Sequence, residues 1–300
     1  MLYVILFILL ESLITLDYVD TTAAQSIGVC YGLNGNNLPS KQETVDLLKS
    51  NGIGRVRIYS PATEIFEAFK GSNIELIVGA GESLQAIGSD PNAANAWVNT
   101  NIKPYAQYVK FKYIIVGNEV HPVTLLLGNS YPPSAGAFSQ IAIGYVQQII
   151  NFLVRNGSPF LANIYPYFAY AGNQKDISLD YALFTQQGTN DVGYQNLFDA
   201  MLDATYAALE KIGGDNLTIV VTESGWPSFG GVGASDENAR LYYQNLINHV
   251  KGGTPKKPNQ PIETYLFALF DENQKPGAET EQHFGLFHPD KSPKYGLSFK

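Results

Sequence analysis

Two glutamates stand where an apolar run of the sequence gives way to polar residues. Glu119 follows residues 113–118, and Glu223 lies near the end of residues 217–225. A carboxylate at the end of an apolar strand is costly to desolvate unless it has a chemical task. Two carboxyls on opposite sides of a glycosidic bond can break it, because one protonates the leaving oxygen while the other attacks the anomeric carbon or activates water. The pair therefore predicts hydrolysis of a glycosidic bond; two surface glutamates at strand ends are the alternative.

Two further polar residues, Asn118 and Arg57, also lie in largely apolar segments of the sequence. Asn118 directly precedes Glu119 and is suited to donate a hydrogen bond to a sugar hydroxyl beside the reacting carbon, which would help a charged transition state. A strand-end cap is its other interpretation. Arg57 interrupts the apolar residues 55–60. We interpret it as an inward-pointing charge that is paired with a carboxylate.

These residues need a scaffold that brings strand ends together, and the sequence alternates short apolar runs with helical patterns. Most of the runs are apolar on both faces, which is typical of parallel strands covered by helices. The predicted strands are residues 27–32, 55–60, 74–80, 113–120, 160–167, 217–225 and 262–271, with residues 181–184 as the candidate for an eighth. Eight such units would close a single (β/α)8 TIM barrel, an α/β fold whose catalytic residues lie at the C-terminal ends of the strands.

Helix boundaries can be recognised between the predicted strands. Ser40 with Glu43 has the pattern of a capping box. Asp90 followed by proline opens a helix that is expected to run towards Val109. Ser235 caps another helix before the last predicted strand.

Composition narrows the class of partner. The chain has 300 residues, of which 45% are hydrophobic and 15% charged, so a folded core is expected, with residues 26–300 as one catalytic domain. The net charge of −8 argues against nucleic acid, which needs a basic surface, and against an anionic polysaccharide. A neutral polymer fits. The 19 Tyr and 16 Phe suggest a cleft that stacks sugars, although most of these rings are interpreted as core.

No pattern in the sequence calls for a cofactor. The chain has no G-x-S-x-G, P-loop, dinucleotide or H-E-x-x-H motif, and its four histidines lack metal-ligand spacing. We therefore expect no cofactor and no metal. The single cysteine, Cys30, lies in an apolar run and is interpreted as a structural thiol rather than a nucleophile.

Residues 1–25 have the pattern of a secretory signal. Residues 1–10 are apolar, and the small residues before Gln25 suit cleavage, although no Lys or Arg precedes the apolar run and Glu11 interrupts it. The run is too short for a membrane span. We expect secretion to the cell wall or apoplast, with the vacuole as an alternative, no stable membrane insertion after cleavage, and a monomer.

Several segments resemble glycoside hydrolase family 17, the plant 1,3-β-glucanases and their relatives. Residues 221–228, V-T-E-S-G-W-P-S, are similar to the signature of that family, and residues 116–120, V-G-N-E-V, resemble its acid/base strand. Similar matches occur at residues 27–32, 163–170 and 270–287. They follow one order along about residues 27–300, so a chance match is improbable. The resemblance implies a (β/α)8 barrel that retains the anomeric configuration.

Carried over to this sequence, the resemblance implies a role for each matching residue. Glu223 would be the nucleophile and Glu119 the acid/base. The substrate-binding candidates are Tyr31, Asn118, Asn163, Tyr165, Phe168, Tyr170, Glu272, Lys275 and Glu281. Lys275 lies between two acids and would hold their carboxylates in place. A solvated loop at the barrel rim is the alternative for this trio, and core packing is the alternative for the aromatic residues, above all Phe168.

The substrate implied by the resemblance is a neutral 1,3-β-glucan, such as callose or fungal wall glucan, cut internally. A mixed-linkage 1,3-1,4-β-glucanase on the same fold is one alternative, and the residues alone do not separate the two. A glucan-binding protein that has lost turnover is another, although the presence of both glutamates argues against it.

Overall fold

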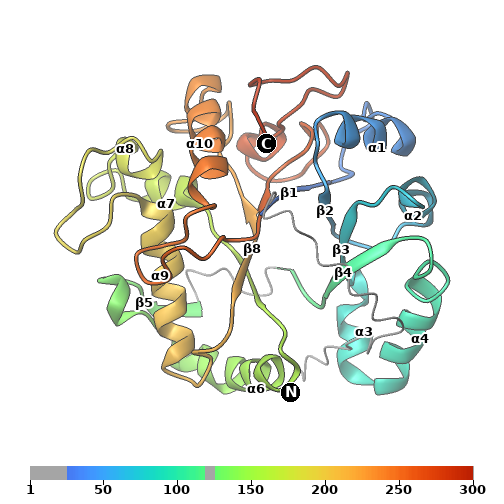
Figure 1. Ribbon diagram of the computed structural model, residues 1–300, viewed down its shortest axis with the longest axis horizontal. Helices are drawn as coiled ribbons and strands as arrows, with labels where there is room; N and C mark the ends of the chain where they lie inside the picture. The colour runs from blue at the N-terminus through green and yellow to red at the C-terminus, as the bar shows by residue number, and fades with distance from the viewer. Residues whose placement is uncertain (1–25, 119–125, 300) are drawn as a thin grey trace.

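Seven parallel strands form one curved sheet in the computed structural model of this protein, which describes residues 26–118 and 126–299 (Figure 1). Each of the seven overlaps a predicted strand. They are β1 (Ile27–Cys30), β2 (Arg55–Ile58), β3 (Glu75–Gly79), β4 (Lys110–Ile115), β7 (Phe160–Asn163), β8 (Ile219–Ser224) and β9 (Thr264–Leu266). Their order in the sheet is β4-β3-β2-β1-β9-β8-β7, and each neighbouring pair is parallel. A parallel α/β sheet of the TIM-barrel type was predicted, and the structure confirms it.

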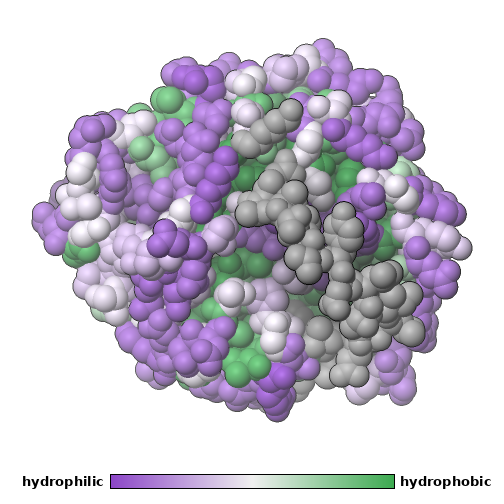
Figure 2. All heavy atoms as spheres, viewed as in Figure 1, coloured by the Kyte–Doolittle hydropathy of each residue, from purple (hydrophilic) through white to green (hydrophobic). Residues whose placement is uncertain are grey.

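Helices surround the sheet on both sides of the view in Figure 1, with α1–α4 grouped opposite α6–α10. The helices are α1 (Lys41–Ser50), α2 (Thr63–Phe69), α3 (Leu84–Ser89), α4 (Pro91–Asn101), α6 (Gln140–Asn156), α7 (Pro166–Gly172), α8 (Leu179–Ala182), α9 (Leu197–Glu210) and α10 (Asp236–His249). Three short 3-10 helices are η1 (Gly81–Ser83), η2 (Pro133–Ala135) and η3 (Glu279–Gln282). With helices outside and side chains inside, β1 and β8 are buried throughout. The face seen in Figure 2 is hydrophilic around its rim and exposes hydrophobic residues nearer its centre.

Local side chains determine where the helices begin. Ser40 and Glu43 form the predicted capping box at α1. Asp90 caps α4 by accepting a hydrogen bond of 2.9 Å from the backbone nitrogen of Asn92. The prediction that this helix runs towards Val109 is wrong, because α4 ends at Asn101 and turns follow. Pro104, which has no N–H to donate, lies in those turns.

The predicted eighth strand is a helix instead. Residues 179–182 form α8, whose first turn is capped by the Ser178 hydroxyl, which accepts a hydrogen bond from the Tyr181 backbone nitrogen at 3.2 Å. Within the described residues the sheet is therefore open, with β4 and β7 as its two edges. Side chains of β4 are mostly half-buried, unlike those of β1 and β8. The strands β5 (Leu127–Asn129) and β6 (Ala137–Phe138) form a separate antiparallel pair and do not close the gap.

Packing explains the roles of Trp226 and Cys30. Trp226, next to the turn after β8, is completely buried against Tyr167 and Tyr242, so it packs and does not stack on a ligand. Cys30 is buried, and its thiol lies 3.3 Å from the carbonyl oxygen of Thr222. Burial raises the pKa of the Cys30 thiol to about 12, which fits a structural role.

Candidate active site

A hollow of about 430 Å³ opens at the C-terminal ends of the strands, where a barrel positions its reactive groups. Glu223 near the end of β8 lies at this hollow, and Asn118 lies just beyond β4. The hollow is lined by Tyr31, Gly32, Leu33, Asn34, Ile58, Tyr59, Ser60, Asn118, Tyr165, Phe168, Glu223, Phe267, Glu272, Lys275, Glu281 and Phe284. Most of the substrate-binding residues predicted from the sequence are therefore brought together.

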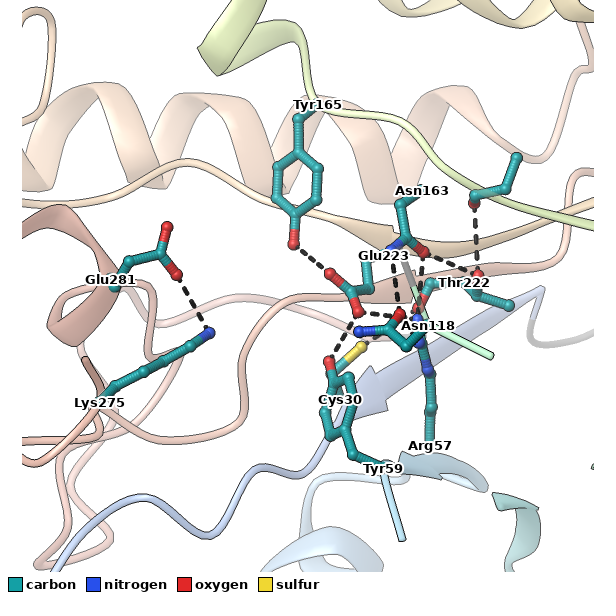
Figure 3. Close-up of polar contacts among 11 residues, drawn as sticks. Cys30, Arg57, Tyr59, Asn118, Asn163, Tyr165, Thr222, Glu223, Lys275 and Glu281 are labelled. Atoms are coloured by element: carbon teal, nitrogen blue, oxygen red, sulfur yellow. Dashed lines mark hydrogen bonds and ion pairs between the residues drawn. The ribbon is translucent and has the colours of Figure 1, made fainter. Parts of the chain in front are cut away.

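Three side chains that donate hydrogen bonds contact the carboxylate of Glu223 (Figure 3). The guanidinium of Arg57 lies 2.9 Å from its Oε1. The hydroxyl of Tyr59 donates to the same oxygen at 3.0 Å, and the hydroxyl of Tyr165 donates to Oε2 at 2.7 Å. Because Glu223 is only 5% exposed, these contacts take the place of water around the carboxylate.

Arg57 connects this carboxylate to the surrounding strands. Its guanidinium donates to Asn118 Oδ1 at 2.6 Å, to Asn163 Oδ1 at 3.1 Å and to the Thr222 carbonyl at 2.8 Å. Burial alone would lower the pKa of Arg57, but the negative charge of Glu223 acts against it and the pKa is raised overall. The prediction that Arg57 is an inward charge paired with a carboxylate is confirmed.

The two asparagines next to Arg57 have different tasks. Asn163 accepts hydrogen bonds from both Arg57 and the Thr222 hydroxyl, at 3.1 and 2.9 Å, and it is absent from the lining of the hollow. Asn118 lines the hollow and commits its side-chain oxygen to Arg57. Its amide nitrogen is then the group that can donate to a ligand hydroxyl. The site thus places Asn118 where the sequence analysis expected it and gives Asn163 a supporting position.

Tyr59 is a site residue that the sequence analysis missed. Burial raises the pKa of both Tyr59 and Tyr165 well above the usual value, and the charge of Glu223 acts in the same direction on each, so both hydroxyls stay neutral donors. Tyr59 lies two residues after Arg57, which is the spacing that puts side chains on one face of a strand. That spacing is the signal that would have identified it.

A second set of polar residues, Glu272, Lys275 and Glu281, follows β9 and lines the hollow. The ammonium of Lys275 lies 3.1 Å from a Glu281 oxygen and 3.9 Å from the centre of the Phe267 ring. Glu272 is 3% exposed and accepts a 2.6 Å hydrogen bond from the Asn34 backbone nitrogen. Burial raises the pKa of Glu272 above its ordinary value. All three predicted members of this trio line the hollow, so they are not merely a solvated rim.

Glycine allows two loops to approach the site closely. A Cβ on Gly32 would lie 2.3 Å from both oxygens of Glu272. A Cβ on Gly225, two residues after Glu223, would lie 2.3 Å from the Phe267 carbonyl. Any larger residue at either position would displace a group that lines the hollow.

Aromatic rings form one wall of the hollow. The ring centres of Tyr165 and Phe168 lie 5.2 Å apart. Phe168 is 46% exposed, so one face of its ring is available to a ligand. Tyr31 also lines the hollow but is nearly buried, whereas Tyr170 packs against Trp226 at 5.8 Å and does not line it. The prediction of a substrate-binding position for Tyr170 therefore finds no support in the lining. Two rings of this wall, Phe267 and Phe284, were not predicted.

Glu119 falls outside the described residues, as do residues 1–25. It directly follows Asn118, which lines the hollow. Its role as acid/base stays a prediction.

Comparison with known proteins adds a second, independent line of argument. The sequence matches the profile of glycosyl hydrolases family 17 over residues 27–126 and 122–299. The chain belongs to this family. A glucan endo-1,3-beta-glucosidase of Vitis vinifera is 53% identical over 93% of this chain and 93% of the relative. The basic vacuolar isoform of a glucan endo-1,3-beta-glucosidase from Nicotiana plumbaginifolia is 46% identical over 97% of this chain and 91% of the relative. The structure of a β-1,3-glucanase and allergen of Cryptomeria japonica pollen matches with a TM-score of 0.89 and 44% identity, covering 92% of this chain and 99% of the other.

The two matching pieces of the family profile overlap at residues 122–126, which lie between β4 and β5 in the sequence. The alignment with the Vitis vinifera relative spans 321 positions, more than the 300 residues of the whole chain, so the relative has residues with no counterpart here.

Proposed function

We propose that this protein is a retaining endo-hydrolase of 1,3-β-glucan, with Glu223 as nucleophile and Glu119 as acid/base. The observation that carries the proposal is the environment of Glu223. A buried carboxylate held by Arg57, Tyr59 and Tyr165 at the floor of a sugar-sized hollow is paired with a cation, oriented and shielded from water. A nucleophilic carboxylate needs those three properties.

The proposed reaction proceeds in two displacements. An oxygen of Glu223 attacks the anomeric carbon, the bond to the leaving oxygen breaks, and Glu119 transfers its proton to that oxygen. A water molecule then attacks the anomeric carbon, Glu119 takes up its proton, and Glu223 is released as carboxylate. The amide nitrogen of Asn118 donates to a hydroxyl of the sugar undergoing reaction, and this bond strengthens as charge develops.

The lining of the hollow supports a neutral sugar as substrate. Its only cation, Lys275, is already paired with Glu281, so a carboxylated sugar finds no unpaired partner among the described residues. Phe168 offers an exposed ring to the apolar face of a pyranose. The names of the relatives in family 17 favour the 1,3 linkage.

A glucan-binding protein without turnover is the second candidate, and one observation favours it. The family profile matches in two pieces that overlap at residues 122–126, a few residues after Glu119, and among the described residues β4 pairs only with β3. Without a working acid/base, Glu223 and the aromatic wall would bind sugars and not cleave them.

Product analysis separates these candidates. The purified protein is incubated with laminarin, a 1,3-β-glucan, and separately with barley mixed-linkage glucan. The proposal predicts a spread of oligosaccharides from laminarin at early times. Glucose alone would indicate an exo-enzyme, cleavage of barley glucan alone would indicate the mixed-linkage alternative, and binding without any product would indicate the second candidate.

The destination of the protein is part of the proposal. Cleavage near Gln25 would deliver residues 26–300 to the cell wall or apoplast as a monomeric catalytic unit, with the vacuole as the alternative. Among the described residues, no helix combines the length and the apolar character that crossing a bilayer requires. N-terminal sequencing of the exported protein tests this, since an intact Met1 on a membrane fraction would contradict cleavage.

A further inference from the structure

A second hollow lies among α8, α9 and α10, outside the sheet and on the opposite side of Figure 1 from α1–α4. Its volume is about 480 Å³, within the range of pockets that hold small ligands. It is lined by Phe184, Thr189, Gly193, Gln195, Asn196, Asp199, Asn245, Asn248, His249 and Pro255. No residue is shared with the hollow around Glu223, and the proposed hydrolysis uses none of them.

The floor of this second hollow is a fixed polar pair. Asp199 is 4% exposed, and one of its carboxylate oxygens lies 2.7 Å from His249 Nε2. Its other oxygen accepts a 2.8 Å hydrogen bond from the side chain of Asn196, which is itself buried. The imidazole and carboxylate are thereby oriented before any ligand arrives. Such a preformed polar floor lowers the ordering cost of binding.

One aromatic ring is held against this floor by unfavourable backbone geometry. Phe184 has a φ of 62°, which is rare for a bulky residue. Its ring lies 5.1 Å from the His249 ring, and the residue stays half-buried. Residues kept in this region of backbone space are strained and cluster at ligand sites. The ring supplies the apolar face that a pyranose stacks upon.

The rim carries groups that both donate and accept hydrogen bonds. Asn248, Gln195 and Thr189 are exposed, and Asn245 is half-buried, anchored by donating to the Leu183 carbonyl at 2.8 Å. The described lining contains no Lys or Arg, and its one histidine, His249, already faces the carboxylate of Asp199. Amides and a hydroxyl around an aromatic ring match a ligand with many neutral hydroxyls.

We propose that this hollow is a second carbohydrate-binding site, which holds one or two pyranose units of a neutral glycan away from the site of cleavage. The choice of 1,3-β-glucan as that glycan rests on the proposed function. Binding here would keep the protein on a polymer while another stretch of chain is cut, because a second contact raises the effective concentration of the first.

Side-chain amide signals distinguish the two hollows in one NMR titration. The full protein carrying Glu223→Gln, labelled with 15N, is titrated with a 1,3-β-linked glucose hexasaccharide. Signals of Asn118 and Asn163 report on the hollow around residue 223, and signals of Asn245 and Asn248 report on the second hollow. The proposal predicts that Asn245 and Asn248 shift along a saturable curve of their own. No shift at these two residues while Asn118 saturates would overturn it and leave the proposed function standing.

Asn248→Ala provides the matched test, with Asn99→Ala on α4 as its control, because both residues are exposed asparagines on helices. Loss of one hydrogen bond predicts about five- to tenfold weaker binding at the second site for Asn248→Ala and no change for Asn99→Ala. Shifts at Asn245 without any laminarin cleavage by the unsubstituted protein would support the second site and refute the hydrolase. Equal affinities for the two variants would refute the second site.

If Glu223→Gln does not fold, sedimentation with insoluble 1,3-β-glucan on ice uses the unsubstituted protein. Asn248→Ala should then leave a larger fraction in solution than Asn99→Ala. Equal fractions contradict the proposal.

Discussion

Arg57 and Glu223 form an ion pair of 2.9 Å between side chains that are 2% and 6% exposed. The pair joins β2 to β8, two strands from different parts of the sheet, and Arg57 extends the contact to Asn118 and Asn163. A buried pair of this kind is weak support for stability in itself, but removing one partner leaves an uncompensated charge. It holds the carboxylate in one orientation at the floor of the hollow.

Removing Arg57 should therefore destabilise the protein strongly. Arg57→Leu leaves Glu223 without its cation and should cost about 3–5 kcal/mol in the free energy of unfolding. Urea unfolding followed by circular dichroism measures it. Arg240→Leu is the control, because Arg240 pairs with Glu237 on the exposed surface and its loss should change little. Equal unfolding midpoints for the two variants would contradict the role given to Arg57.

Tyr165→Phe should reduce turnover while leaving the fold intact. The substitution removes the 2.7 Å hydrogen bond to Glu223 Oε2 but keeps the ring. A hydrogen bond to a charged group contributes about 1.5–3 kcal/mol, so kcat should fall about 10- to 100-fold on laminarin. Tyr170→Phe is the control, since Tyr170 packs against Trp226 and does not line the hollow. A kcat equal to that of the control would show that Tyr165 does not orient the nucleophile.

Because of Asp203, the free energy of unfolding should fall as the pH rises above the ordinary pKa of an aspartate. Its side chain is buried, and burial raises its pKa above 3.8 despite hydrogen bonds from Tyr194 and the Lys256 backbone. The folded state then binds more protons than the unfolded state between the two pKa values, so the free energy of unfolding falls with rising pH through that window. Asp203→Asn should reduce the fall, measured as unfolding free energies at about pH 4 and pH 7.

Asp290 serves as the control, because its pKa is shifted in the opposite direction to that of Asp203. Hydrogen bonds from the Ser292 side chain and backbone lower its pKa below 3.8. Its contribution is present above that value and disappears as the pH falls, so Asp290→Asn should not flatten the same fall. Parallel pH profiles for Asp203→Asn and the unsubstituted protein would contradict the account of Asp203.

The open sheet predicts uneven hydrogen exchange. Strand β1 is paired with β2 and β9, whereas β4 pairs only with β3 and β7 only with β8 among the described residues. Amides of β4 and β7 should therefore exchange faster than those of β1, as mass spectrometry of peptides will measure. Equal protection would mean that a further strand pairs with these edges.

Much of this architecture could be predicted from residue patterns, and the exceptions have physical reasons. The seven strands were recognisable because they are apolar on both faces, and Glu223 was recognisable because a carboxylate ended one of them. The prediction of an eighth strand was wrong because Ser178 caps a helix there, and this local hydrogen bond outweighs the apolar character of residues 181–184. The contact between Tyr170 and Trp226 could not be predicted, because no sequence spacing indicates it.

The site was harder to predict than the strands because it depends on long-range contacts. Asn118 could be proposed from its place beside Glu119 and Glu272 from the resemblance, but the hydrogen bond from Tyr59 to Glu223 joins residues 164 positions apart. Substrate binding by Asn163 stays a prediction, and the structure adds that its side chain accepts hydrogen bonds from Arg57 and Thr222. Only the curved sheet shows which polar residues line the hollow and which lie behind them.

The central claim is that Glu223 attacks the sugar directly, and the stereochemistry of the first product tests it. Direct attack followed by hydrolysis inverts the anomeric carbon twice, so the configuration is retained. Proton NMR of laminarin hydrolysis, recorded before mutarotation, resolves the two anomers of the newly formed reducing end. The account predicts that the β-anomer appears first; an α-anomer appearing first would show that water attacks instead and that Glu223 is not the nucleophile.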